Sequence, residues 1–331
     1  MNSPAAWVCV WMLSLTWVSS APAGTGPHMY AAVFSVRGSV SGYHTGSFGP
    51  FVREQGTTWR QMSLSNVYTF GFGYFEGAGR EITYVAAGNG LHRSEDGGKT
   101  WKILTTWTTM EILSVLPDPS DPGLLRVSTP WGVYRSTDGG GTWASSNAGF
   151  RRWYVERLSG DVSDRAIVYA VAEDDLYRST DRGVHWKPLG AAGGSMPLVF
   201  LQDSRFPDTL FLAVEDGGIR RSTDGGKSWN HMPSTGTRTL YALALSPDGS
   251  LYAAGWKTGV LRSSDSGLTW ATVWDQPPSD VVLSFAVNPS EPRHLAAGTD
   301  GRGVYESRDG GATWVYAGLD GGKVKSINFY P

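Results

Sequence analysis

Hydrophobic and polar positions alternate along short stretches of this chain, and each stretch ends in the same kind of polar turn. In the segment from Gly132 to Trp143, the alternation up to Arg135 predicts a strand, and the Asp-Gly-Gly after Thr137 predicts a tight turn. Glycine accepts positive φ without a Cβ clash, and the Ser and Asp side chains can accept hydrogen bonds from turn N–H groups. The unit is therefore predicted to be a β-hairpin whose return strand begins at Thr142.

The turn phrase occurs six times, and we call it the box: Ser-x-Asp-x-Gly-x-(Thr, Ser or His)-Trp. Its aspartates are Asp96, Asp138, Asp181, Asp224, Asp265 and Asp309. Successive copies lie 41 to 44 residues apart, the length of one four-stranded propeller blade. We expect the aspartates to hold their turns, and the closing tryptophans to pack against their neighbours. Those tryptophans are Trp101, Trp143, Trp186, Trp229, Trp270 and Trp314.

A degenerate seventh copy precedes the first box, with Glu54 in the place of the Asp and Trp59 in the place of the Trp. The first copy has no inner strand of its own, because residues 29–32 already match the second strand of a later blade. Residues 325–331, after the last box, have the pattern of the missing inner strand. We therefore predict an all-β fold, a single seven-bladed β-propeller of four-stranded antiparallel blades. The C-terminal strand is expected to join the N-terminal blade and close the ring.

Composition agrees with an all-β exported protein, since glycine is 43 of 331 residues and charged residues are only 18%. Residues 5–18 are an uncharged apolar run, and Ala21-Pro22-Ala23 offers a processing site. Residues 1–23 are therefore predicted to be a signal peptide and residues 24–331 the propeller. No Lys or Arg precedes Arg37, so an uncleaved interfacial anchor is the alternative. We expect a secreted or periplasmic protein, with no transmembrane segment in the mature chain.

Charge and titratable residues exclude several classes of ligand. The chain has 28 basic and 30 acidic residues, and no basic run indicates nucleic acid. Binding of a polyanion through a local cluster on one face is the alternative. The six histidines show no metal-ligand spacing, and one Asp per turn supplies too few oxygens for calcium. We expect no metal, no cofactor and no nucleic acid partner. The single cysteine, Cys9, lies in the leader, so the mature chain is expected to have neither a disulfide nor a free thiol. We also expect a monomer.

Five tryptophans remain once those of the leader and the seven box copies are set aside. The sequence places all five either between the second and third strands of a blade or between one blade and the next. In a propeller these connections share one face, the face that surrounds the channel opening. Indole rings gathered there indicate a surface that binds a sugar or a partner's side chains. The alternative is packing of loops over the blade ends. The five are Trp107, Trp131, Trp153, Trp256 and Trp274.

Charged residues in the same connections complete the candidate ligand-binding set. They are Arg152, Asp175, Asp300 and Arg302. Carboxylates from different blades could face each other across the channel, as acid–base cleavage of a glycosidic bond requires. The alternative is that these loop charges are simply solvated. No residue is assigned a catalytic role.

The box resembles the Asp-box, also called the bacterial neuraminidase repeat. The fuller phrase Gly-Val-Tyr-Arg-Ser-Thr-Asp-Gly-Gly-x-Thr-Trp looks like the version in secreted seven-bladed propellers. That group includes oligoxyloglucan-cleaving hydrolases, photosystem II assembly factors and sortilin-type receptors. The chain lacks the Arg-Ile-Pro of sialidases and the second propeller of the hydrolases, so their catalytic residues are not carried over. The assembly factors are similar in size and in bearing arginines along the repeat. Here the arginines before the box Ser are Arg93, Arg135, Arg178, Arg221 and Arg262, and Glu306 breaks the series.

Two classes of function follow from these features. We predict a secreted propeller that acts as a binding or scaffold module for a glycan or protein partner, through its Trp-rich channel face. The alternative is a carbohydrate-active enzyme, a glycoside hydrolase or polysaccharide lyase, with acidic residues at the channel mouth. A scaffold for a membrane complex is a third possibility.

Overall fold

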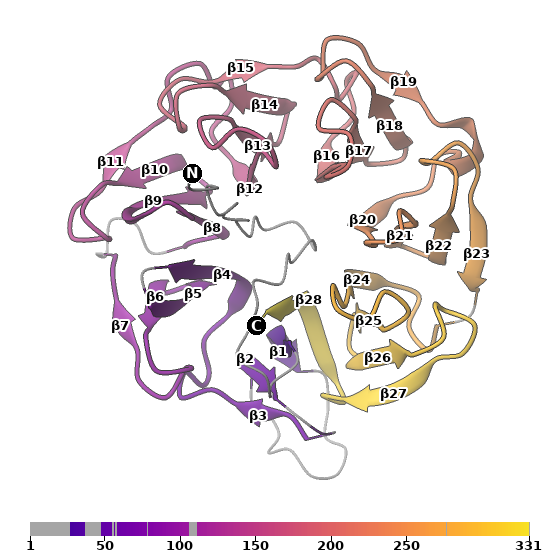
Figure 1. Ribbon diagram of the computed structural model, residues 1–331, viewed down its shortest axis with the longest axis horizontal. Helices are drawn as coiled ribbons and strands as arrows, with labels where there is room; N and C mark the ends of the chain where they lie inside the picture. The colour runs from indigo at the N-terminus through magenta and orange to yellow at the C-terminus, as the bar shows by residue number, and fades with distance from the viewer. Residues whose placement is uncertain are drawn as a thin grey trace, which may run out of the picture.

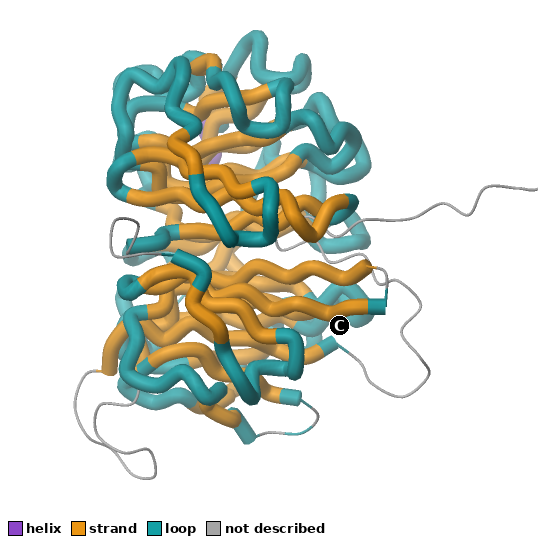
Figure 2. The backbone as a smooth tube through the Cα atoms, turned by 90° about the vertical axis from the view of Figure 1, so that its left-hand side faces the viewer, coloured by secondary structure: helices purple, strands orange, loops and turns teal. Residues whose placement is uncertain are grey.

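The computed structural model describes residues 27–36, 48–54, 56, 58–77, 79–105, 111–275 and 277–330. The predicted leader and Trp107 lie outside the described residues. The chain forms seven four-stranded antiparallel sheets arranged as blades around a central axis (Figure 1). Seen from the side, the strands run between two loop-covered faces (Figure 2). The predicted seven-bladed all-β fold is confirmed, and a short 3-10 turn, Pro233–Thr235, is the single helical element of the described residues.

We number the blades along the chain and give their strands from the channel outward. Blade 1 contains β28 (Gly322–Tyr330), β1 (His28–Val36), β2 (Gly49–Arg53) and β3 (Arg60–Gln61). Blade 2 contains β4 (Thr69–Gly77), β5 (Arg80–Ala87), β6 (Gly90–Ser94) and β7 (Lys102–Ile103). Blade 3 contains β8 (Ser114–Asp118), β9 (Asp121–Thr129), β10 (Gly132–Ser136) and β11 (Ala144–Ser145). Blade 4 contains β12 (Val155–Gly160), β13 (Val168–Ala172), β14 (Leu176–Ser179) and β15 (Lys187–Pro188).

The remaining three blades follow the same order. Blade 5 contains β16 (Pro197–Gln202), β17 (Leu210–Val214), β18 (Gly218–Ser222) and β19 (Asn230–His231). Blade 6 contains β20 (Leu240–Leu245), β21 (Leu251–Gly255), β22 (Gly259–Ser263) and β23 (Ala271–Trp274). Blade 7 contains β24 (Val282–Val287), β25 (Leu295–Thr299), β26 (Val304–Ser307) and β27 (Val315–Gly318).

Each box is the turn between the third and fourth strands of its blade, and the one in blade 3 shows how it is held. Ser136 Oγ accepts a hydrogen bond from Gly140 N at 2.8 Å and donates one to Asp138 Oδ1 at 2.8 Å. The same Oδ1 accepts from Thr142 N at 2.8 Å, and Oδ2 accepts from Thr142 Oγ1 at 2.7 Å. These donors lower the pKa of Asp138 to about 2. The box aspartate is therefore occupied by its own turn.

Blade 1 is built from both ends of the described chain. Strand β28 pairs antiparallel with β1, from His28 opposite Tyr330 to Val36 opposite Gly322. This pairing confirms the predicted closure of the ring. On the outer edge, Trp59 Nε1 donates to Ala317 O of blade 7 at 2.7 Å. Trp143 makes the corresponding bond to blade 2, through Leu104 O at 2.9 Å, so the closing blade keeps the regular contact between neighbours.

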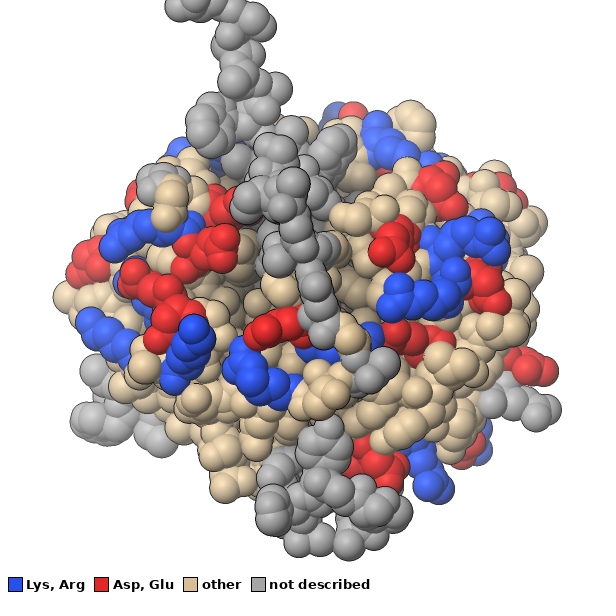
Figure 3. Space-filling model, turned by 60° about the horizontal axis from the view of Figure 1, so that its bottom comes forward, with Lys and Arg blue, Asp and Glu red and all other residues tan. Residues whose placement is uncertain are grey.

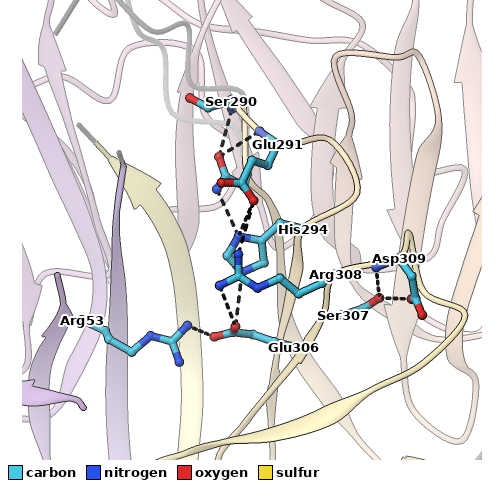
Figure 4. Close-up of polar contacts among 9 residues, drawn as sticks. Arg53, Ser290, Glu291, His294, Glu306, Ser307, Arg308 and Asp309 are labelled. Carbon is cyan, nitrogen blue, oxygen red and sulfur yellow. Dashed lines mark hydrogen bonds and ion pairs between the residues drawn. The ribbon is translucent and has the colours of Figure 1, made fainter. Parts of the chain in front are cut away.

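A buried ion pair crosses the boundary between blade 7 and blade 1 (Figure 4). Arg53 of β2 donates to Glu306 of β26, and both side chains are 7% exposed. His294 Nε2 lies 3.3 Å from the other oxygen of Glu306, and Arg308 Nη2 lies 3.8 Å from it. Glu306 stands at the position that five other blades fill with arginine before the box Ser. Its reversed charge is explained by Arg53, which it meets across the boundary.

Backbone hydrogen bonds assign the connections to two faces. On the box face, the box turn bonds the turn between the first and second strands, as Gly225 N does to Asp208 O at 3.0 Å. On the opposite face, the turn between the second and third strands bonds the segment that enters the first strand of the same blade. Trp256 N, for example, donates to Thr239 O at 3.0 Å, and Asp300 N donates to Val281 O at 3.1 Å. We call this second surface the connection face.

Candidate binding face and central channel

Three tryptophans of the predicted set are half exposed, and all three lie on the connection face. Trp131 and Trp256 occupy turns between second and third strands, with exposed fractions of 53% and 49%. Trp153 precedes β12 and is 61% exposed. Tyr68 and Met196, which sequence reasoning missed, are also exposed in the segments that enter β4 and β16. The connection face therefore carries large apolar side chains open to solvent in several blades.

Polar side chains surround Trp153 where blade 3 passes to blade 4. Arg152 Nη1 lies 3.4 Å from Glu173 Oε1, an exposed ion pair that is worth at most about 1 kcal/mol. Tyr154 Oη donates to Glu156 Oε2 at 2.8 Å. Burial, followed by the nearby charge of Glu156, raises the pKa of Tyr154. This sector therefore carries an indole, a guanidinium and hydrogen-bonding groups on neighbouring residues.

Asp175 has a structural role in the loop that leaves blade 4. Its side chain is buried, and its oxygens accept backbone N–H bonds from Leu176, Gly190, Ala191 and Ala192 at 2.7 to 3.1 Å. Because these four donors already bond the carboxylate, we do not include Asp175 among the ligand-binding residues. The sequence placed it in an open turn because it cannot show which backbone N–H groups return to it.

Trp274 is the second residue that the structure places differently from the sequence prediction. It is the last residue of strand β23 rather than part of a connection. Its ring stacks on Trp314 with centroids 4.5 Å apart and lies 5.3 Å from Tyr305. It therefore packs blade 6 against blade 7. The prediction failed because β23 continues two residues further than the outer strands of blades 2 to 5, which the local sequence does not reveal.

Asp300 and Arg302 lie in the turn between β25 and β26 on the connection face. Asp300 Oδ1 is 3.7 Å from Lys323 Nζ, and the Asp300 side chain is 19% exposed. Arg302 is exposed. Asp300 thus has a cationic partner already, whereas Arg302 projects into solvent.

The inner strands carry a β-bulge near the end of the channel that opens on the connection face. In β12, Val155 pairs with Ala172 and Arg157 pairs with Val171, which leaves Glu156 as the extra residue. The same irregularity recurs in β4, β16, β20, β24 and β28, and Leu113 occupies the corresponding place before β8. A bulge redirects the extra side chain out of the regular pleat. The seven residues at these places, which we call the bulge ring, are Phe70, Leu113, Glu156, Leu198, Tyr241, Leu283 and Lys325.

The central channel contains a cavity of about 90 Å³. All seven inner strands line it, and five members of the bulge ring are among the lining residues. Two cations also line it, Arg157 from blade 4 and Lys325 from blade 1. Burial lowers the pKa of both groups. The channel is therefore narrow, largely apolar at the bulge ring, and positively charged on two sides.

The sequence contains a signal for this site that was missed. The bulge position lies 11 to 13 residues after the box tryptophan of each repeat, and it holds an apolar residue in five of the seven copies. Glu156 and Lys325 are the exceptions, and a charge at a position that is otherwise apolar indicates a side chain that is not part of the core. The alternation of hydrophobic and polar residues does not reveal the bulge positions, because a bulge shifts the two-residue period by one residue.

Three further observations concern the described part of the chain. Among these residues no group of three His, Cys, Asp or Glu side chains could hold a metal ion. No helix of the described segments is long and apolar enough to cross a membrane. Basic and acidic side chains are interspersed on the side shown in Figure 3, with no large area of one sign.

The fold places this chain among the seven-bladed β-propellers, and comparison with solved structures agrees. A GH74 xyloglucanase from Xanthomonas campestris is 22% identical with a TM-score of 0.64, covering 78% of this chain and 46% of its own. YCF48 bound to D1 peptide is 17% identical with a TM-score of 0.57, covering 75% of this chain and 89% of its own.

A third neighbour is the extracellular domain of the putative one component system BT4673 from B. thetaiotaomicron. It is 12% identical with a TM-score of 0.61, covering 84% of this chain and 38% of its own. This chain thus spans less than half the length of the xyloglucanase and of the BT4673 structure. No family model matches the sequence, and no curated protein matches it. At these identities the likeness shows the fold.

Proposed function

We propose that this protein is an exported Asp-box propeller that binds a glycan or protein partner on its connection face. The observation that carries the proposal is the one-sided exposure of Trp131, Trp153 and Trp256, because the box tryptophans are buried or half-buried between blades. Covering the exposed half of one indole contributes roughly 2–3 kcal/mol, so two or three such rings can anchor a partner.

The solved neighbours are compatible with this proposal. One of them is a propeller of similar length with a bound peptide, and another is a xyloglucanase. The Arg152–Glu173 pair and the Tyr154 hydroxyl beside Trp153 add the polar groups that fix the orientation of a ligand.

The test compares two double variants with similar loss of exposed apolar surface. Trp131→Ala with Trp153→Ala changes the connection face, and Phe206→Ala with Leu268→Ala changes the box face, where the two side chains are 59% and 54% exposed. The wild-type protein is first screened on a glycan array with plant, microbial and sialylated glycans and on a peptide array. We expect the connection-face variant to weaken the best ligand at least tenfold, and the box-face variant to bind normally. Equal binding by both variants, or no ligand in either array, would refute the proposal.

The alternative function is a carbohydrate-active enzyme, and one feature favours it. Glu156 lies at the channel mouth beside Tyr154, and the charges of Glu111 and Glu173 also act on that tyrosine. Turnover of any glycan from the same panel, abolished in Glu156→Gln, would support this alternative. Absence of turnover leaves the binding role.

A further inference from the structure

The central channel contains two cations that are not part of the binding surface proposed above. Arg157 belongs to blade 4 and Lys325 to blade 1, and both line the cavity of about 90 Å³. In a ring of seven, blades 1 and 4 are three positions apart, which places them on nearly opposite sides of the axis (Figure 1). The two side chains therefore approach the same narrow space from opposite walls.

Neither cation has an anionic partner within 4.0 Å among the residues that the structure describes. The two carboxylates whose charges act on Lys325 have other contacts. Glu156 accepts a hydrogen bond from Tyr154 Oη at 2.8 Å, and Asp300 lies 3.7 Å from Lys323. With Lys323 and Asp300 offsetting each other, Arg157 and Lys325 face a single carboxylate. The channel therefore has an excess of positive charge.

Arg157 and Lys325 are half-buried, and a cation that loses part of its hydration without gaining a partner costs free energy. Burial lowers the pKa of Lys325, and the charges of Lys323 and Arg157 lower it further, while Glu156 raises it. An anion placed between Lys325 and Arg157 would offset this cost. The guanidinium could bind a carboxylate through two parallel hydrogen bonds.

The size of the cavity and the polarity of its lining restrict the class of anion that fits. A cavity of about 90 Å³ has room for several water molecules, which suits a carboxylate group. Phe70, Leu113, Tyr241 and Leu283 of the bulge ring line the same space. They would cover an apolar stem attached to the carboxylate.

We propose that the central channel is a binding site for a small aliphatic carboxylate, with Arg157 and Lys325 holding the carboxylate and the apolar members of the bulge ring covering its stem. The site goes beyond the binding face proposed above. Each can fail without the other, because the channel residues and the exposed indoles are different side chains.

The experiment titrates the full-length protein with n-alkyl carboxylates from acetate to hexanoate, and with the matching alcohols. Binding is followed by calorimetry and by NMR shifts of the arginine Nε–H signals. We expect the carboxylates to bind and the alcohols not to bind. Arg157→Met and Lys325→Met should each weaken binding at least tenfold, whereas Glu156→Gln should tighten it. The matched control is Lys187→Met, which removes one exposed positive charge from the outer strand β15 and should change nothing.

Several outcomes would overturn the proposal. Carboxylates that do not bind, or that bind Arg157→Met and Lys325→Met as well as the wild type, exclude the channel site. Equal weakening by Lys187→Met would show that net charge alone is responsible. Thermal unfolding of each variant checks that the ring is intact. If either channel variant unfolds, Arg157→Lys and Lys325→Arg keep the charge, and retained binding in them supports the site.

Discussion

Blade 1 and the other six blades have the same four strands but are assembled differently. Blades 2 to 7 each form from consecutive strands, whereas blade 1 combines β28 with β1, β2 and β3 from the other end of the chain. The six regular blades carry complete boxes. In blade 1, Glu54 occupies the Asp position and pairs with Arg60 at 2.6 Å in an exposed contact. The turn of blade 1 thus lacks the Ser–Asp arrangement that holds the others.

Blade 1 has a different interaction at its outer boundary. The buried pair of Arg53 and Glu306 joins it to blade 7 at the place where five other blades present an arginine. The comparison shows that the regular repeats belong to the blades that form from consecutive strands of the chain. A break in the regularity, such as Glu306, marks a contact that only the folded ring creates. Three predictions test this difference.

The largest effect is expected from removing residues 322–331. This deletion takes away the inner strand of blade 1 and exposes the edge of β1. We expect the shortened chain to show no cooperative thermal transition by circular dichroism and to aggregate. A synthetic peptide of residues 322–330 added during refolding should restore part of the transition. A cooperative, monomeric deletion variant would show that closure by β28 is dispensable.

The next effect is expected at Glu306. Glu306→Gln leaves Arg53 buried without its anionic partner, and breaking a buried pair in this way costs about 3–5 kcal/mol. Urea unfolding measures the loss. The double variant Arg53→Met with Glu306→Met removes both charges and should recover most of it. A loss of less than 1 kcal/mol in Glu306→Gln would mean that the pair does not stabilise the boundary.

The smallest effect is expected from the protonation of His294, which lies against Glu306 and Phe329. Burial, together with the charges of Arg308 and Arg53, lowers its pKa to about 4. The unfolded chain binds this proton near pH 6.5, so stability should fall as the pH drops from 6.5 to 4, by at most about 3 kcal/mol. His294→Phe should flatten this part of the unfolding free energy against pH. An unchanged profile would assign the dependence to other groups.

The fold was predictable because the repeat records it several times. Box spacing set the blade length, Glu54 and Trp59 supplied the seventh copy, and residues 325–331 supplied the closing strand. Errors of one to three residues remained at strand ends, as for β28, which begins at Gly322. Strand ends depend on pairing partners that the local sequence does not name.

The candidate site was predictable only in part. Trp131, Trp153 and Trp256 fall on the connection face because chain order alone fixes which connections lie there. Asp175 and Trp274 were misjudged, since the hydrogen bonds of one and the stacking of the other involve distant residues. The channel cations were not predicted, because a bulge interrupts the alternation from which side-chain direction is inferred.

The bulges have a consequence for how such a molecule can change over time. A residue displaced from the pleat contributes little to the contacts between neighbouring sheets, so its identity can vary at small cost to stability. Seven positions of this kind surround one opening. Substitutions there could convert the passage from cationic to anionic or fully apolar while the architecture stays the same, which would let one scaffold acquire new chemical preferences in single steps.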